Sequence, residues 1–370
     1  MQTRPCGKTG INLSLIGYGA MRMHGPDVER WAALVREAAE LGLNYFEASN
    51  RYCTSSCETK VGLGLKGFPR DRVIVSTKSS VRNTPTADAV RKDIDLSLTK
   101  LQMDYVDFYQ VWGLTWKSFS ESVGKPGGML EGIRAAQKAG LVRHVGFTTH
   151  DKPEGIISLL GTGEFESVTL VYNVLNRSNE PAIAEAGRLG VGVIVMSPLW
   201  GGLLGSDSPL MRDVLGKGFV RTTAEAGFRF VLSNPHVTCA ASGAVTSEQL
   251  RDNARIAAEF APFTEAEKSE VEGALSELKA QAARLCTGCR YCMPCPQGVG
   301  ISEVFRLANA ARIYGFTAGA RRDYALFAKD WPYEDHKDAT HCTRCGACLE
   351  KCPQKIAIPD ELQKAHDALK

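Results

Sequence analysis

The sequence has no apolar run that approaches the roughly 18 residues of a membrane span, so no transmembrane helix is expected. It also has no excess of one charge: 44 Lys and Arg stand against 41 Asp and Glu, a net +3, and no basic block stands out. A nucleic-acid groove and a polybasic membrane patch are therefore not expected. The first residues, Met1-Gln-Thr-Arg-Pro-Cys6, lack the apolar core of a signal peptide, so we expect a cytoplasmic protein.

Cysteine is the unusual component, with twelve residues in the chain. A cytosolic protein keeps its thiols reduced and uses so many cysteines mainly for metal binding or catalysis. Four of them are scattered, namely Cys6, Cys53, Cys57 and Cys239. The other eight follow residue 285 in two close runs, which are the strongest functional signal in the sequence.

Both runs have the spacing of iron–sulfur ligands. The first reads Cys286-Thr-Gly-Cys289-Arg-Tyr-Cys292-Met-Pro-Cys295-Pro, and the second reads Cys342-Thr-Arg-Cys345-Gly-Ala-Cys348-Leu-Glu-Lys-Cys352-Pro. The second matches the C-x2-C-x2-C-x3-C-P run of bacterial ferredoxins, and the first is one residue short in its last spacing. Two four-thiolate zinc sites are the alternative. Four cysteines per run, each run ending in Cys-Pro, favour iron–sulfur clusters.

The resemblance to two-cluster ferredoxins also implies a ligand assignment. In those proteins the fourth cysteine of each run binds the other cluster. One [4Fe–4S] cluster then takes Cys286, Cys289, Cys292 and Cys352. The second takes Cys342, Cys345, Cys348 and Cys295.

Before the cysteine-rich part, strand-like apolar runs alternate with segments of helical period, which is typical of parallel βα units. The eight strand candidates are Leu13–Gly17, Tyr45–Ser49, Val73–Thr77, Val106–Val111, His144–Thr148, Ser167–Tyr172, Gly192–Met196 and Val237–Ala241. Eight units in roughly 260 residues is the size of a (β/α)8 barrel. We therefore predict an α/β protein with a (β/α)8 TIM barrel over residues 1–263, which begins with a hairpin at Gln2–Leu13. Residues 264–370 are predicted to form a linker helix and a helical ferredoxin-like iron–sulfur domain.

Candidate catalytic residues follow consecutive strands of the predicted barrel. In this fold the chemistry lies at the C-terminal ends of the strands, where Glu47, Tyr52 and Lys78 are found. A lysine beside a phenol lowers the phenol pKa from about 10, and a carboxylate keeps the lysine charged. We predict Tyr52 as proton donor to a developing alkoxide, Lys78 as the residue that lowers its pKa, and Glu47 as the residue that orients Lys78.

Further segments resemble the aldo/keto reductase family, in the branch with a C-terminal ferredoxin-like module. They are Gly7-Lys-Thr-Gly10, Ser14-Leu-Ile-Gly-Tyr-Gly-Ala-Met21, Asp104-Tyr-Val-Asp107, Tyr172-Asn173, Ser197-Pro-Leu199, Gly243 and Ser247-Glu-Gln-Leu-Arg-Asp-Asn253. With the first cysteine run, the resemblance covers essentially the whole chain. It implies an oxidoreductase that uses NADP(H) or NAD(H).

By this resemblance, the family's catalytic Asp, Tyr, Lys and His fall on Glu47, Tyr52, Lys78 and Trp112. Trp112 cannot exchange a proton and offers only an indole N–H donor. Some family members without this histidine reduce activated carbon–carbon double bonds. We therefore expect a small-molecule substrate with either a carbonyl or an activated C=C bond, and we expect Trp112 to face it.

The resemblance also places a cofactor site, in altered form. Positions that contact the nicotinamide in the family carry Thr148, Thr149, Thr169 and Met196. The arginine that holds the 2′-phosphate is replaced by Gln249, with Arg251 nearby, while the backbone of Ser197–Gly202 remains to bind a pyrophosphate. The predicted cofactor residues are Thr148, Thr149, Asn173, Ser197, Leu199, Gly201, Gly243, Ser247, Gln249 and Asn253.

Hydride transfer moves two electrons together and needs no cluster, so the two modules leave alternatives open. Either the clusters serve a redox partner protein, or the barrel takes single electrons from the clusters without a nicotinamide, with a flavin not excluded. A non-redox lyase or isomerase that uses Tyr52 and Lys78 for proton transfer is a third interpretation. The fourth is an electron-transfer scaffold with a degenerate barrel site.

Overall fold

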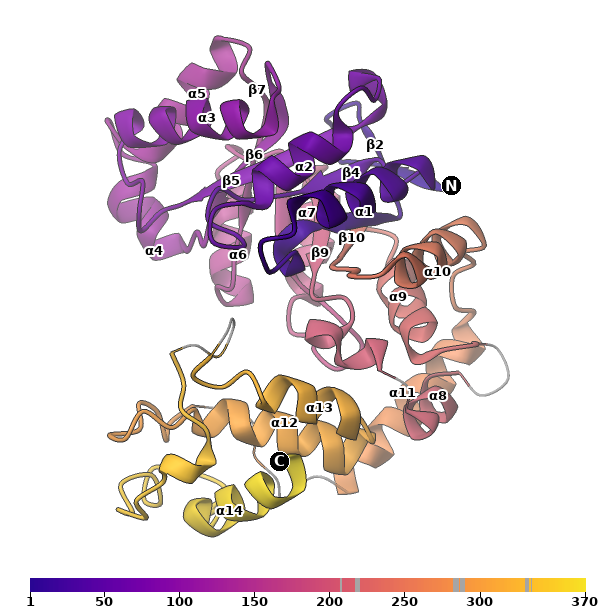
Figure 1. Ribbon diagram of the computed structural model, residues 1–370, viewed down its shortest axis with the longest axis vertical. Helices are drawn as coiled ribbons and strands as arrows, with labels where there is room; N and C mark the ends of the chain where they lie inside the picture. The colour runs from indigo at the N-terminus through magenta and orange to yellow at the C-terminus, as the bar shows by residue number, and fades with distance from the viewer. Residues whose placement is uncertain (207, 217–219, 282–285, 287–289, 330–332, 334) are drawn as a thin grey trace. The chain divides into compact units, whose positions relative to one another are not determined.

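The computed structural model describes residues 1–206, 208–216, 220–281, 286, 290–329, 333 and 335–370 (Figure 1). These residues form two compact units. The first comprises Met1–Trp200 and Gly227–Pro262, and the second comprises Gly201–Ala226 and Phe263–Lys370. The sequence had placed residues 201–226 in the barrel domain, whereas the structure groups them with the C-terminal residues. Helix α8 (Pro209–Gly216) explains this grouping, because it packs against α11 (Glu265–Gln281).

The first unit contains the predicted closed barrel. Its strands run in the order β10-β3-β4-β5-β6-β7-β8-β9, and every neighbouring pair is parallel. Their bounds are β3 (Ile16–Gly19), β4 (Tyr45–Glu47), β5 (Ile74–Ser80), β6 (Val106–Trp112), β7 (Val142–Thr148), β8 (Ser167–Val171), β9 (Gly192–Met196) and β10 (Cys239–Ser242). The sequence-based prediction of a TIM barrel is therefore confirmed.

The predicted N-terminal hairpin is also present, as antiparallel strands β1 (Thr3–Pro5) and β2 (Asn12–Ser14). The first barrel strand was predicted to begin at Leu13, but Leu13 pairs with Arg4 in this hairpin. Leu13 is buried with Tyr45, Phe108 and Ile194 in one apolar cluster. The hairpin thus packs its apolar side chain against residues of the barrel strands.

Helices alternate with the barrel strands along the chain. They are α1 (Val28–Glu40), α2 (Cys57–Leu65), α3 (Ala87–Leu101), α4 (Trp116–Ser118), α5 (Met129–Lys138), α6 (Pro153–Gly161), α7 (Glu180–Leu189), α9 (Thr223–Ser233) and α10 (Ser247–Ala258). Short turns are η1 (Ala20–Arg22), η2 (Arg70–Arg72), η3 (Phe119–Val123) and η4 (Trp200–Gly205). Helix α1 begins where the Asp27 carboxylate accepts from the Arg30 backbone N–H at 3.0 Å, and the chain leaves it through left-handed Gly42.

In the second unit, α12 (Ile301–Tyr314), α13 (Thr317–Tyr324) and α14 (Ile358–Leu369) pack together, with η5 (Ala339–His341) before the second cysteine run (Figure 1). Backbone bonds join the segments that precede α12 and η5: Gly300 N donates to Lys337 O at 3.0 Å, and Lys337 N donates to Gly298 O at 2.9 Å. Among the described residues, no helix has the length and apolar character needed to cross a membrane.

Candidate active site

Three neighbouring strands bring the predicted catalytic side chains to one end of the barrel. Glu47 ends β4, Lys78 lies near the end of β5, and Trp112 ends β6. The strands are parallel, with Glu47 beside Ser76 and Lys78 beside Gln110. Their C-terminal ends therefore lie together, which is where this fold places its chemistry.

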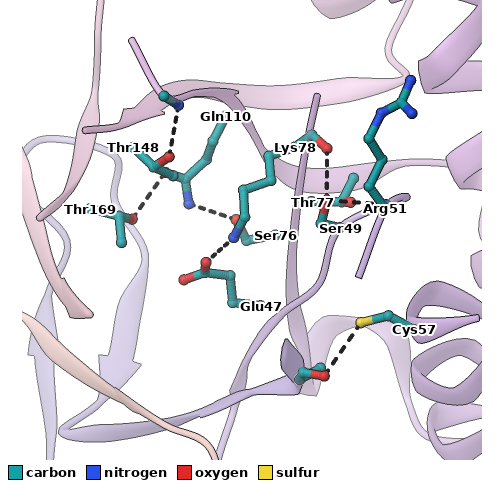
Figure 2. Close-up of polar contacts among 12 residues, drawn as sticks. Glu47, Ser49, Arg51, Cys57, Ser76, Thr77, Lys78, Gln110, Thr148 and Thr169 are labelled. Atoms are coloured by element: carbon teal, nitrogen blue, oxygen red, sulfur yellow. Dashed lines mark hydrogen bonds and ion pairs between the residues drawn. The ribbon is translucent and has the colours of Figure 1, made fainter. Parts of the chain in front are cut away.

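A buried ion pair forms the base of this site. The Lys78 Nζ donates to Glu47 Oε1, and Figure 2 shows the two side chains directed at each other. Lys78 is 1% exposed and Glu47 is 7% exposed. Burial is the largest single effect and lowers the pKa of Lys78, but Glu47 and Tyr52 together more than offset it, so the net pKa lies above the ordinary value. Lys78 is therefore charged at neutral pH. The other carboxylate oxygen of the pair, Glu47 Oε2, is buried and has no hydrogen-bond partner among the described residues.

Tyr52 lies beside this pair, on the loop between β4 and α2. The Lys78 Nζ is 4.7 Å from the centre of the Tyr52 ring, and the Trp112 ring packs edge-on against Tyr52 with centroids 5.4 Å apart. Burial raises the pKa of Tyr52, and the Lys78 charge only partly offsets it, so the net pKa is raised. The prediction that Lys78 lowers the Tyr52 pKa below its ordinary value is wrong in its net direction, because desolvation is the larger effect. The phenol stays protonated at neutral pH, which suits a proton donor.

The loop that carries Tyr52 has an unusual backbone. Cys53, Thr54 and Ser55 have φ angles of 53°, 54° and 65°, all in the left-handed region. Side chains far along the chain hold the loop: Asn50 Nδ2 donates to Asp93 Oδ2 at 2.7 Å, and Lys100 Nζ donates to Ser55 O at 3.2 Å. Such backbone persists only where surrounding contacts impose it. The position of Tyr52 therefore depends on contacts with α3.

A polar network inside the barrel was missed by the sequence analysis. The Gln110 Nε2 donates to Ser76 Oγ at 2.9 Å, and Thr169 Oγ1 donates to Gln110 Oε1 at 3.0 Å (Figure 2). Thr169 is thereby engaged with Gln110. The Gln110 Nε2 also donates to Tyr45 OH at 3.3 Å. The sequence did contain a signal for this network, because side chains alternate between the two faces of a strand. In β6, Gln110 therefore shares a face with Phe108, which lies in the buried apolar cluster.

The predicted nicotinamide contacts are largely engaged within the protein. Thr148 Oγ1 accepts from Gly113 N at 3.2 Å (Figure 2). Thr149 Oγ1 donates to Leu114 O at 2.7 Å and accepts from Asp151 N at 2.9 Å. The hydroxyl proton of Thr149 is therefore committed to a local contact.

Asn173 is likewise committed to local structure. Its Nδ2 donates to Ser197 O at 3.0 Å, and its Oδ1 accepts from Leu175 N and Asn176 N. Ser197 and Gly201, further along the chain, have left-handed backbone with φ angles of 58° and 67°. Leu199, between them, packs on the barrel core. We assign Asn173 the role of shaping this turn.

At the start of α10, the residues near the predicted phosphate position are also paired. Thr246 caps the helix by accepting from Gln249 N at 3.2 Å, directly before Ser247, and Gln249 Oε1 accepts from Val245 N at 2.8 Å. The Arg251 guanidinium forms an ion pair with Glu37 at 3.0 Å. Asn253 Nδ2 donates to Ser242 Oγ at 2.8 Å beneath the helix. Gly243 follows β10, where an added Cβ would lie 3.1 Å from the Arg22 side chain.

The described cluster cysteines divide between two cavities in the second unit. One cavity is lined by Cys292, Cys295, Cys342, Cys345 and Cys348. A second cavity is lined by Cys286, Cys292 and Cys352, so Cys292 borders both cavities. Cys289 lies outside the described residues, and none of the described cysteines forms a disulfide. Soft thiolates gathered around each cavity fit an iron–sulfur cluster.

Comparison with known proteins identifies both parts of the chain. The model of the aldo/keto reductase family matches residues 15–276, and a 4Fe-4S dicluster domain matches residues 285–357. L-galactose dehydrogenase of Arabidopsis thaliana is 32% identical over 56% of this chain and 69% of its own length. NADH-specific methylglyoxal reductase of Escherichia coli is 26% identical over 55% of this chain and 69% of its own length. The aldo-keto reductase AKR11C1 from Bacillus halodurans, in its holo form, superposes with a TM-score of 0.66 at 26% identity, covering 74% of this chain and 96% of that structure.

Proposed function

The chain belongs to the aldo/keto reductase family and carries a C-terminal 4Fe-4S dicluster domain, and from this premise we propose that its barrel reduces a small organic carbonyl or activated C=C substrate. The observation that carries the proposal is the charged Lys78, held by Glu47 beside Tyr52 at the C-terminal end of the barrel. A nicotinamide, when bound, supplies the hydride. Tyr52 donates the proton to the reduced substrate, Lys78 limits the rise in its pKa, and Glu47 keeps Lys78 in place.

The clusters are proposed to be two [4Fe–4S] groups held by the predicted cysteine sets. Cys295 lines the same cavity as the first three cysteines of the second run, and Cys352 lines that of Cys286 and Cys292. This exchange of the fourth cysteine is the arrangement of two-cluster ferredoxins. Each cluster carries one electron at a time, so two clusters match one hydride equivalent.

The presence of Trp112 favours an activated C=C bond over a carbonyl as the group that is reduced. Its indole packs on Tyr52, and it has no group that exchanges a proton. We expect Trp112→His to raise the rate of aldehyde reduction by about tenfold, since an imidazole can exchange a proton where the indole N–H only donates a hydrogen bond, and a positioned acid–base group is worth at least that much. Reduction of a cyclic enone should fall in the same variant.

The matched control is Trp112→Phe, which keeps an aromatic ring against Tyr52 without any donor. Initial rates with an aldehyde and a cyclic enone, measured for the three proteins, separate the two classes. Equal aldehyde rates in the His and Phe variants would contradict the role assigned to position 112.

We propose that the barrel binds NAD(H) more tightly than NADP(H). A 2′-phosphate needs a cation, but position 249 holds a neutral Gln whose Oε1 accepts from Val245 N, and Arg251 is paired with Glu37. We expect NADPH to bind about tenfold more weakly than NADH, the value of one missing charge-assisted contact. Gln249→Arg should remove this difference, whereas Gln249→Met, of similar length and no charge, should not; fluorescence titration with both nucleotides measures it. A preference for NADPH in the unmodified protein would contradict this assignment.

A cluster-fed reductase without nicotinamide is the second candidate. It is favoured by Thr149 and Asn173, whose polar groups are engaged in local contacts where the family pattern places nicotinamide contacts. In this case the clusters supply single electrons to the barrel substrate, and Tyr52 keeps the same role as proton donor.

A further inference from the structure

Two cysteines that the proposed mechanism does not use lie beside Tyr52. Cys53 directly follows Tyr52, and Cys57 is the first residue of α2. Their Sγ atoms donate to the same backbone oxygen, Ala20 O, each at 3.6 Å; Figure 2 shows the Cys57 bond. The Cys53 Sγ also donates to Met21 O at 3.4 Å. The two thiols therefore converge on one point of the barrel unit.

The two thiols also contact each other. A side-chain hydrogen bond joins them, and burial together with this bond raises the pKa of the Cys57 thiol well above its ordinary value. The chain between them folds back tightly, because Ser56 N donates to Cys53 O at 3.2 Å and Cys57 N donates to Tyr52 O at 3.4 Å. A disulfide needs two cysteines that lie close together with converging side chains. Cys53 and Cys57 meet both conditions.

The pair is open to solvent on one side only. Cys53 is partly exposed, whereas Cys57 is 0% exposed. A reagent from solution therefore reaches the Cys53 sulfur first. The other two cysteines of the first unit, Cys6 and Cys239, share one apolar cluster and are both 0% exposed. Among the described cysteines of this unit, access thus distinguishes the pair beside Tyr52.

We propose that Cys53 and Cys57 are a redox-sensitive pair, which a small-molecule disulfide such as glutathione disulfide converts into a reversible internal disulfide that displaces Tyr52. Disulfides of reducing compartments are usually transient, and they serve catalysis or redox sensing. The effect on Tyr52 rests on the proposed function, in which this phenol is the proton donor. The formation of the disulfide itself does not depend on that function.

The reaction is thiol–disulfide exchange in two steps. The Cys53 thiolate attacks one sulfur of the small disulfide, one small thiolate leaves, and Cys53 carries a mixed disulfide. This step consumes the Cys53 thiol and with it a hydrogen bond that raises the Cys57 pKa. The Cys57 sulfur then attacks the Cys53 sulfur and expels the second small thiolate. The two thiolates take up the two cysteine protons, so two protein thiols are oxidised while one small disulfide is reduced to two thiols.

The new bond should move Tyr52 because the two sulfurs must approach from hydrogen-bond contact to bonding distance. Cys57 is held in the buried core at the start of α2, so the loop residue Cys53 makes the movement. Its contacts with the Ala20 and Met21 carbonyls are then lost. Tyr52 is joined to Cys53 by one peptide bond, and a misplacement of about 1 Å in a catalytic group costs about 10²-fold in rate. The oxidised protein should therefore turn over about 10²-fold more slowly.

The test treats the complete holoprotein anaerobically with glutathione disulfide, followed by an acid quench, alkylation and digestion with trypsin. The peptide Tyr52–Lys60 follows Arg51 and contains Cys53 and Cys57 as its only cysteines. We expect this peptide to be unalkylated and lighter by two hydrogen atoms, and we expect dithiothreitol treatment before the quench to restore two alkylated cysteines. The rate of substrate reduction, measured in parallel, should fall about 10²-fold and recover with dithiothreitol. Cys6 and Cys239 serve as the internal control and should be alkylated throughout.

The matched variant is Cys53→Ser, which keeps a small polar side chain on the loop. Once reduced it should turn over like the unmodified protein, and glutathione disulfide should not slow it. The absorbance of the iron–sulfur clusters should stay constant in both proteins, which excludes cluster loss as the cause of inhibition. The peptide mass is measured on the unmodified protein, so it does not depend on whether the variant folds.

Three results would each overturn the proposal: two alkylated cysteines in Tyr52–Lys60 after the treatment, a disulfide that leaves the rate unchanged, or equal inhibition of Cys53→Ser. Failure of the proposed function is a different result. In that case the protein reduced with dithiothreitol shows no substrate reduction, while the peptide mass still reports whether the disulfide forms.

Discussion

Tyr52→Phe should lower turnover by about 10²- to 10⁴-fold, the usual contribution of a positioned general acid. The phenol is the proton donor of the proposed mechanism, and Phe keeps the ring packing against Trp112 and Lys78. Substrate KM and the melting temperature should therefore change little. Single-turnover rates of the reduced, substrate-saturated enzyme measure the chemical step directly.

The control is Tyr105→Phe, which changes a phenol just before β6, at the opposite end of that strand from Trp112. It should leave turnover unaltered. The pH profile adds a second readout: Tyr52 acts in its protonated form and its pKa is raised, so turnover should fall only above the ordinary value of 10.0. Turnover that survives Tyr52→Phe would contradict every interpretation in which Tyr52 is the proton donor.

Lys78→Met should destabilise the protein by about 3–5 kcal/mol, because it leaves the Glu47 carboxylate buried without its partner. Lys78 is 1% exposed and Glu47 is 7% exposed, and Glu47 already has one unpartnered oxygen. The free energy of unfolding in urea should fall by this amount. Turnover should fall as well, since Lys78 is also the charge that opposes the rise in the Tyr52 pKa.

Two variants identify the cause. Lys78→Met/Glu47→Leu removes both charges and should recover most of the lost stability without recovering turnover. Arg91→Ala breaks an exposed pair with Asp95, whose side chains are 44% and 54% exposed, and should cost only about 0.5 kcal/mol. If Lys78→Met is as stable as Arg91→Ala, the buried pair does not hold the site together.

Features that depend on local pattern could be predicted from the sequence. Alternating apolar runs predicted the barrel, and cysteine spacing predicted the iron–sulfur module, because each signal lies within a few neighbouring residues. The proximity of Glu47 and Lys78 could also be predicted, because the parallel strands of a barrel all end at the same edge.

Features that depend on distant partners could not be predicted. The pairing of Arg251 with Glu37 joins α10 to α1, and the Asn50 bond to Asp93 joins the Tyr52 loop to α3. The Tyr52 pKa was predicted in the wrong direction because desolvation depends on the packed surroundings, which the sequence does not display. Residues 201–226 were assigned to the barrel because their link to α11 arises only through packing.

Anaerobic titration of the holoprotein with NADH, and separately with NADPH, tests the central claim most directly. Absorbance reports nucleotide binding and cluster reduction, and electron paramagnetic resonance counts the reduced clusters. The proposed function predicts saturable binding of NADH, tighter than that of NADPH, and substrate reduction by the bound nucleotide. If neither nucleotide binds while chemically reduced clusters still drive substrate reduction, the nicotinamide-dependent assignment is wrong and the cluster-fed reductase replaces it.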